Sequence, residues 1–351
     1  MDLVSAPFWE AGSRADALAR AGVLIASAVG ASSAEETLVL VVVPAPSGEM
    51  LAVGDTVTPL LIARGSPAEI LAVAGDPGGA TSDTTRHAGV VANLDVAPTI
   101  LRFFGVPVPD AMVGSEILAV GEPPDELHER FLDRQRIRLP VQLAVLGVIL
   151  GVLIGCVAAL ALGTRVPVPV RSRVASLALV ATATVPLLLP ASVLPRLSYA
   201  VVLPTIFLGG VGIATAARLL GGPSPFRRVA VVALVWVGIV VVDGALGFPS
   251  RPTALWGSGV LDGGRFFGMT NTAGGILLGG AVLVASRVRP GWGVLLLLGA
   301  ALFAGLPWTG ANLGEGVGLL VAVGVWMAIA LTEASVLGRI LMALLTAVGG
   351  T

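Results

Sequence analysis

Long apolar stretches fill the second part of the chain, and they constrain its fold more than any other feature. Stretches of about 17–25 apolar residues can cross a bilayer as helices. Seven such stretches occur, at 140–162, 174–194, 199–220, 229–247, 270–286, 292–308 and 314–332, and a shorter eighth follows at 336–349. We therefore expect residues 139–351 to form an all-α polytopic transmembrane domain of seven or eight helices, with the lipid bilayer as its partner.

The charged residues divide the chain in the same place. Residues 1–138 hold 18 of the 22 acids and 9 of the 21 basic residues, a net charge of −9, whereas residues 139–351 carry a net charge of +8. The total of −1, without an arginine block away from the membrane-flanking positions, argues against nucleic acid as a partner. The single cysteine, Cys156, lies in an apolar stretch and excludes a disulfide framework and a Cys-rich metal site.

The arginines of the short loops predict the orientation, because such residues are retained on the cytoplasmic side. Loops after the first, third, fifth and seventh stretches hold nine arginines, and the alternate loops hold three. We therefore expect a multi-pass plasma-membrane protein with residues 1–138 on the extracytoplasmic side. One group of arginines disagrees, because it precedes the first stretch, where it alternates with acids: Arg130, Arg134, Arg136 and Arg138.

The first part of the chain alternates between strand and helix patterns, which is typical of an α/β layer architecture. The β-branched run at 37–43 predicts a strand buried on both faces of a parallel sheet. Further strands are predicted at 58–63, 70–74 and 89–93, and helices at 13–30, from Asp95 to just before Gly105, and at 124–138; the intervening 75–86 and 107–124 are predicted to be a loop and an irregular segment.

Residues 37–120 resemble the C-terminal part of an alkaline-phosphatase-superfamily domain, of the sulfatase and phosphoglycerate-mutase kind. The resemblance rests on TPLLIA at 58–63, TSDTTR at 81–86, DVAPTIL at 95–101, FGVPVP at 104–109 and MVG at 112–114. The fold class that we expect is therefore a partial alkaline-phosphatase-like α/β domain at 1–138, followed by the transmembrane domain at 139–351.

The family's catalytic residues have no counterpart here. The nucleophile half of that domain has no room before residue 37, and APSGE at 45–49 stands where the family has metal-binding Asp and His. Pro46 offers no ligand and the Ser47 hydroxyl is a poor substitute for imidazole. We therefore assign no catalytic, metal or cofactor residue and expect no phosphatase or sulfatase activity. Residues 1–10 also lack the pattern of an export signal, and both absences suggest a missing upstream segment or a degenerate domain.

Three polar residues of the first part could have taken part in chemistry, and for each a structural role is the stronger hypothesis. His87 is interpreted as a solvated loop residue and His128 as part of a solvated helix face. Asp95 is interpreted as the N-cap of the helix that follows it.

The polar residues of the membrane half form a second candidate site. Asp243, Arg265, Asn271 and Glu315 all fall on the predicted outer side, and one of the two acids is expected to pair with Arg265. The alternative is that all four are loop and interface residues in water. A polar pocket would suit a transporter or a protein that handles an envelope lipid or glycan, with residues 1–138 as an accessory domain; a membrane scaffold is the third possibility. Oligomeric state and substrate stay open.

Overall fold

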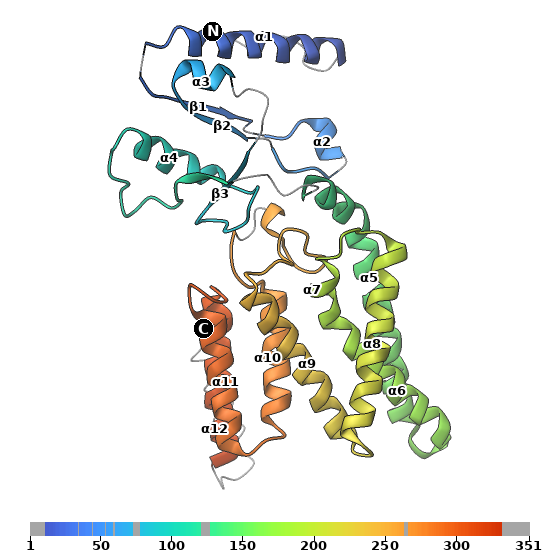
Figure 1. Ribbon diagram of the computed structural model, residues 1–351. Helices are drawn as coiled ribbons and strands as arrows, with labels where there is room; N and C mark the ends of the chain where they lie inside the picture. The colour runs from blue at the N-terminus through green and yellow to red at the C-terminus, as the bar shows by residue number, and fades with distance from the viewer. Residues whose placement is uncertain are drawn as a thin grey trace. The chain divides into compact units, whose positions relative to one another are not determined.

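The computed structural model of the chain describes residues 11–33, 35–43, 45–52, 54–58, 60–72, 78–120, 127–262 and 266–331. The chain divides into two compact units, Met1–Ala52 with Thr56–Asp125, and Val53–Asp55 with Glu126–Thr351. Figure 1 labels most of the helices and strands of both units.

The first unit contains two small sheets, each made of two antiparallel strands. β1 (Thr37–Val42) pairs with β2 (Leu60–Gly65), and β3 (Gly79–Ser82) pairs with β4 (Ile117–Val120). The helices of this unit are α1 (Ala11–Gly30), α2 (Gly48–Ala52), α3 (Pro67–Ala72), the short 3-10 turn η1 (Asn93–Asp95) and α4 (Val96–Phe103).

The strand predictions for this unit fail in several places. The expected parallel sheet is absent from the described residues, because β1 pairs with an antiparallel partner, and no alkaline-phosphatase-like α/β domain is evident there. The predicted strand at 70–74 is helix α3 as far as it is described, and 89–93 forms no strand. β3 and β4 instead lie within predicted loops. A short apolar run does not distinguish helix from strand, nor does it specify the partner strand.

The helix predictions for the same part of the chain are confirmed. α1 covers the predicted amphipathic segment, although Leu24 and Ile25 of its apolar face are exposed. α4 follows Asp95 and ends at Phe103, and Gly105 just beyond it has a φ of +68°, a conformation that favours glycine. The predicted charged helix is the start of a much longer helix, which runs without a break past residue 138.

Helices make up the second unit, and they pack in chain order. Neighbouring pairs are α5 with α6, α6 with α8, α8 with α9, α9 with α10, α10 with α11, and α11 with α12. Their bounds are α5 (Leu127–Leu162), α6 (Val168–Thr184), α7 (Leu188–Ala191), α8 (Tyr199–Gly221), α9 (Pro225–Ala245), α10 (Asn271–Ala285), α11 (Pro290–Gly305) and α12 (Leu313–Leu331).

Four of the described helical segments are long and apolar enough to cross a membrane, which supports a multi-pass membrane protein. They are Leu127–Arg165, Val168–Ala191, Tyr199–Gly221 and Pro225–Ala245. The predicted spans at 270–286, 292–308 and 314–332 are also helices, but their apolar segments are shorter. The shorter stretch at 336–349 lies outside the described residues.

The second predicted span is interrupted by its prolines. α6 ends at Thr184, a 3-10 turn covers Val185–Leu187, and α7 continues from Leu188. Pro186 lies in the turn and removes a helical hydrogen bond there, as expected for an internal proline. Pro204, by contrast, lies within an unbroken α8.

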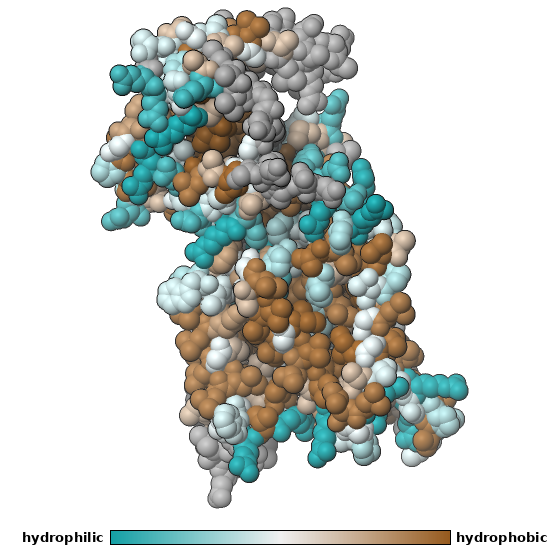
Figure 2. Space-filling view, viewed as in Figure 1, coloured by the Kyte–Doolittle hydropathy of each residue, from teal (hydrophilic) through white to brown (hydrophobic). Residues whose placement is uncertain are grey.

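Apolar side chains cover the outside of the helical unit as well as its interior. Leu153, Leu160 and Leu219 are among many large apolar side chains that are exposed. Figure 2 shows this apolar surface as a brown band over the helices, with hydrophilic residues at both ends. We call the end where α5 begins and α9 ends the cap end, and the end where α5 ends and α6 begins the arginine end.

Candidate functional site

A row of polar side chains on α5 holds the long loop between α9 and α10. Arg130, Arg134, Arg138 and Gln142 recur every four residues, and this spacing places them on one face of the helix. All four donate hydrogen bonds to the cap end of the unit, and three of them reach residues 254–262. We call these four side chains, together with residues 250–262, the α5 clamp.

Arg134 is the centre of the clamp. Its side chain is fully buried, and its two terminal nitrogens donate to the two carboxylate oxygens of Asp262 at 2.6 Å each. Its Nε donates to the carbonyl oxygen of Ala254 at 2.8 Å. A bidentate guanidinium–carboxylate pair of this kind is strong and fixes the geometry of both partners. The pair therefore anchors the loop to α5.

The side chains on either side of Arg134 complete the clamp. Arg138 donates to Asp262 at 3.3 Å and to the carbonyl oxygen of Gly257 at 2.6 Å. Gln142 donates to the carbonyl oxygen of Leu255 at 2.7 Å. One turn of α5 before Arg134, Arg130 donates to the carbonyl oxygen of Ser192 at 3.2 Å. The guanidinium groups of Arg134 and Arg138 thus share the carboxylate of Asp262, and their other described bonds go to neutral carbonyl oxygens.

The charge of Asp262 depends on this arrangement. Burial by itself raises the pKa of a carboxyl group, but the hydrogen bonds from Arg134 and the attraction of both arginines outweigh it, so that the pKa of Asp262 is lowered. The backbone N–H of Gly259 also donates to this carboxylate, at 2.6 Å. Asp262 is therefore ionised at neutral pH.

The clamp explains the arginines that disagreed with the orientation rule. Among the described residues, the acids that alternate with these arginines provide one ion pair, between Asp133 and Arg136, which is 73% exposed, at 3.3 Å. Arg134 and Arg138 pair instead with Asp262. The sequence signal that identifies them is the four-residue spacing, whereas nothing in the sequence indicates Asp262 as the partner.

Asp243, the first residue of the predicted cluster, binds its own loop. Its carboxylate accepts hydrogen bonds from the backbone N–H and the hydroxyl of Ser250, at 3.2 and 2.8 Å. The fully buried start of the loop, Ser250 and Arg251, is thereby tied to the end of α9. Arg265, the predicted partner, lies outside the described residues, so its pairing with Asp243 or Glu315 stays a prediction.

Asn271 and Glu315 meet through a third residue. The buried Asn312 amide donates to the side-chain oxygen of Asn271 at 3.1 Å and to the carbonyl oxygen of Met269 at 3.3 Å. Its own oxygen accepts from the backbone N–H of Glu315 at 3.3 Å. A Cβ on Gly274 would collide with the Glu315 side chain, so this glycine lets α10 and α12 approach closely. The contacts join the first turns of two helices.

Asp95 in the first unit has a structural role, but the predicted mechanism is wrong. It occupies the N-cap position of α4, yet its side chain makes no capping bond to that helix. The fully buried carboxylate accepts instead from the Ser82 hydroxyl at 2.7 Å, from the backbone N–H of Ala92 and Ser115 at 2.8 and 2.9 Å, and from the Thr84 hydroxyl. It therefore joins β3, η1 and the segment before β4.

Of the two histidines, His128 is exposed on its helix as predicted, whereas His87 differs from its predicted solvated state. His87 is half-buried and its Nε2 atom is shielded from solvent. His128 is exposed, but its Nε2 lies 3.2 Å from the buried carboxylate of Asp55, which belongs to the same unit. Within the described ranges, no three His, Cys, Asp or Glu side chains gather in a way that could hold a metal ion.

Comparison with known proteins assigns the chain to no family: no protein-family model, no curated protein and no solved structure matches it.

Proposed function

We propose that this chain is a multi-pass plasma-membrane protein of the cell envelope whose α5 clamp binds the phosphate group of an envelope lipid. The observation that carries the proposal is the sharing of Asp262 by Arg134 and Arg138. One carboxylate balances two guanidinium groups, and the pair lies where α5 changes from polar to apolar sequence, at Leu139.

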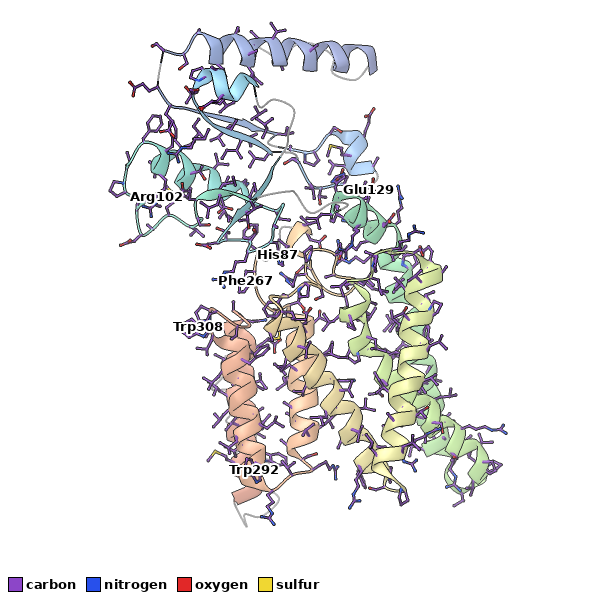
Figure 3. All side chains as sticks on the ribbon, viewed as in Figure 1. His87, Arg102, Glu129, Phe267, Trp292 and Trp308 are labelled. Atoms are coloured by element: carbon purple, nitrogen blue, oxygen red, sulfur yellow. The ribbon has the colours of Figure 1, made fainter. Side chains whose placement is uncertain are left out.

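The three shorter helices also cross the membrane in this proposal. A helix of 15 residues, the length of α10, spans about 22 Å, and a typical hydrocarbon core is about 30 Å thick. Two exposed tryptophans support the crossing, because Trp side chains favour the two membrane interfaces. Figure 3 shows Trp308 and Trp292 near opposite ends of α11. The bilayer would thin around these helices to match them.

The clamp also supports an outward position for the cap end. Nine loop arginines against three place the other end in the cytoplasm. The arginines at the start of α5 were the exception, and Arg134 and Arg138 are held by Asp262 and by carbonyl oxygens of the unit. These two arginines therefore have a structural role at the cap end, and they do not contradict the orientation that the loop arginines predict.

Arg138 is the residue that we assign to the lipid phosphate. Its side chain is 27% exposed, whereas that of Arg134 is fully buried. A guanidinium has five N–H donors, and the two bonds to Asp262 and Gly257 leave donors for a phosphate oxygen. Leu139, the next residue, is exposed at the start of the apolar stretch, so that an acyl chain can lie beside it.

The test compares two arginines that lie two residues apart on different faces of α5. In native mass spectrometry of the purified chain, we expect Arg138→Gln to weaken binding of lysophosphatidic acid about tenfold, because a hydrogen bond to a charged group contributes about 1.5 kcal/mol. Arg136→Gln makes the same change of charge outside the clamp and should leave the affinity within about twofold. Monoacylglycerol, which lacks the phosphate, should not distinguish the variants. Equal losses in both variants would reject the assignment.

A second proposal concerns residues 37–120, which we infer are related to the C-terminal part of the alkaline-phosphatase superfamily without acting as an enzyme in this chain. The commitment of Asp95 to four hydrogen bonds supports a structural use of its motif. We expect purified chain 1–351 not to hydrolyse p-nitrophenyl phosphate or sulfate above the rate without protein. Hydrolysis that requires a divalent cation and stops with a chelator would refute this inference.

A further inference from the structure

The helical unit has a groove on its surface near the arginine end, between α5 and α6. Its volume is about 280 Å³; for comparison, a cavity of about 150 Å³ holds a benzene molecule. Apolar side chains and glycines line it: Gly147, Val148, Gly151, Val152 and Gly155 from α5, and Val174 and Leu177 from α6. A groove in this position opens towards the acyl chains of the bilayer.

The glycines on the α5 side create this space. A Cβ placed on Gly147, Gly151 or Gly155 would meet no atom within 4 Å. The three glycines recur every four residues, so they share one face of α5 and extend over about 12 Å of helix. Larger side chains at these positions would fill the groove, so the space depends on the three glycines.

The charge at the end of the groove indicates what occupies it. Arg171 lies three residues before Val174 and so shares its face of α6. Arg165, Arg171 and Arg173 are all exposed, and none forms an ion pair with a described acid. The sequence between residues 139 and 242 contains no acidic residue at all. Basic groups between membrane helices on the cytoplasmic side are suited to anionic lipid headgroups.

We propose that an anionic phospholipid binds here, with one acyl chain in the groove between α5 and α6 and its phosphate on Arg171, while Arg173 adds positive charge at the same end of α6. The apolar lining excludes a polar ligand from the groove, and the uncompensated arginines at its end favour an anionic headgroup over a zwitterionic one. This site lies at the opposite end of α5 from the clamp and is independent of the function proposed there, although it requires that α5 and α6 cross the membrane.

The test measures which phospholipid remains on the full chain purified from membranes that contain phosphatidylglycerol and phosphatidylcholine. Native mass spectrometry should show bound phosphatidylglycerol on the unaltered chain. We expect Gly151→Leu, which fills the groove, to reduce this retention about fivefold or more, because each excluded methylene loses its burial. Arg171→Gln with Arg173→Gln should abolish the preference for phosphatidylglycerol over phosphatidylcholine.

Matched controls separate the site from general effects of the substitutions. Gly212→Leu adds the same side chain to α8, at another glycine with open space, and Arg218→Gln with Arg227→Gln removes the same charge from the next arginine-end loop. Both should retain phosphatidylglycerol, and so should Arg138→Gln, which tests the clamp alone. Equal retention in all variants would overturn the proposal. A dimer that dissociates with Gly151→Leu would also overturn it, since a second copy would then occupy the groove.

Discussion

Arg134→Gln and Asp262→Asn should each lower the free energy of unfolding of the helical unit by about 3–5 kcal/mol. Asp262→Asn leaves the buried Arg134 guanidinium without a carboxylate, and Arg134→Gln leaves the largely buried Asp262 with only its longer pair to Arg138. The Arg134 side chain is fully buried, and both of its terminal nitrogens rely on the Asp262 carboxylate. Thermal unfolding in detergent, followed by far-UV circular dichroism, measures the loss. It should appear as a large fall in the transition temperature of either variant.

Arg136→Gln is the control for this prediction. Arg136 lies on the same helix, but its side chain is 73% exposed and its pair with Asp133 spans one turn. An exposed pair of this kind contributes little, so the variant should differ from the unaltered chain by no more than about 0.5 kcal/mol. The double variant Arg134→Met with Asp262→Leu should be much less damaging than the sum of the single changes. Equal stability of Arg134→Gln and Arg136→Gln would show that the pair does not hold the loop.

The pair also gives the stability a defined dependence on pH. The pKa of Asp262 is lowered below its ordinary value of 3.8. A carboxyl group of this kind contributes stability that is complete above its unfolded pKa and is lost as the pH falls through its folded pKa. The difference in stability between the unaltered chain and Asp262→Asn should therefore stay constant from about pH 8 to about pH 5 and shrink only in more acid solution. A difference that disappears near neutral pH would contradict the assignment.

The helices of this chain were predictable because their signals are local. The apolar stretches that predicted the first, third and fourth spans coincide with parts of α5, α8 and α9. Length and apolar composition are properties of a single segment, and they are sufficient to identify a membrane helix. The same holds for α4, which follows Asp95 and ends just before a glycine.

The sheets were not predictable in the same way, because pairing joins segments that are distant in sequence. The β-branched run that became β1 identified a strand, but its antiparallel partner β2 follows only after α2. β3 and β4 are four residues each, and their sequences, GATS and ILAV, lie among turn residues. No local pattern connects two segments of that length that are separated by more than 30 residues.

The candidate site contains both kinds of feature, those with a local sequence signal and those that depend on long-range contacts. Asn271 and Glu315 were expected to be neighbours, and they meet through Asn312 at the first turns of α10 and α12. Arg134 and Asp262 are 128 residues apart, and no local pattern connects them. The regular spacing of Arg130, Arg134 and Arg138 was visible in the sequence and indicates a shared face. What that face contacts depends on the tertiary structure.

Gly310→Ala should disrupt the junction between the ends of α10, α11 and α12, with a loss of about 1–3 kcal/mol or more. Gly310 donates from its N–H to the carbonyl oxygen of Phe303 at 2.7 Å, and its own carbonyl oxygen accepts from Met269 at 2.6 Å. A Cβ at this position would lie 2.7 Å from both the Phe303 oxygen and the Ala304 Cα. These are backbone atoms at the end of a packed helix, so the new methyl group cannot be accommodated by a change of rotamer.

Gly318→Ala provides the matched comparison, since a Cβ on that residue of α12 would meet no atom within 4 Å. Alanine favours the helix by up to about 1 kcal/mol over glycine, so this variant should be as stable as the unaltered chain or slightly more stable. Thermal unfolding of both variants under the same conditions decides the question. If the two alanines behave alike, the close approach at Gly310 does not hold in the membrane. If only Gly310→Ala is damaging, the close backbone contact at Gly310 is required to position Asn312 beside Asn271.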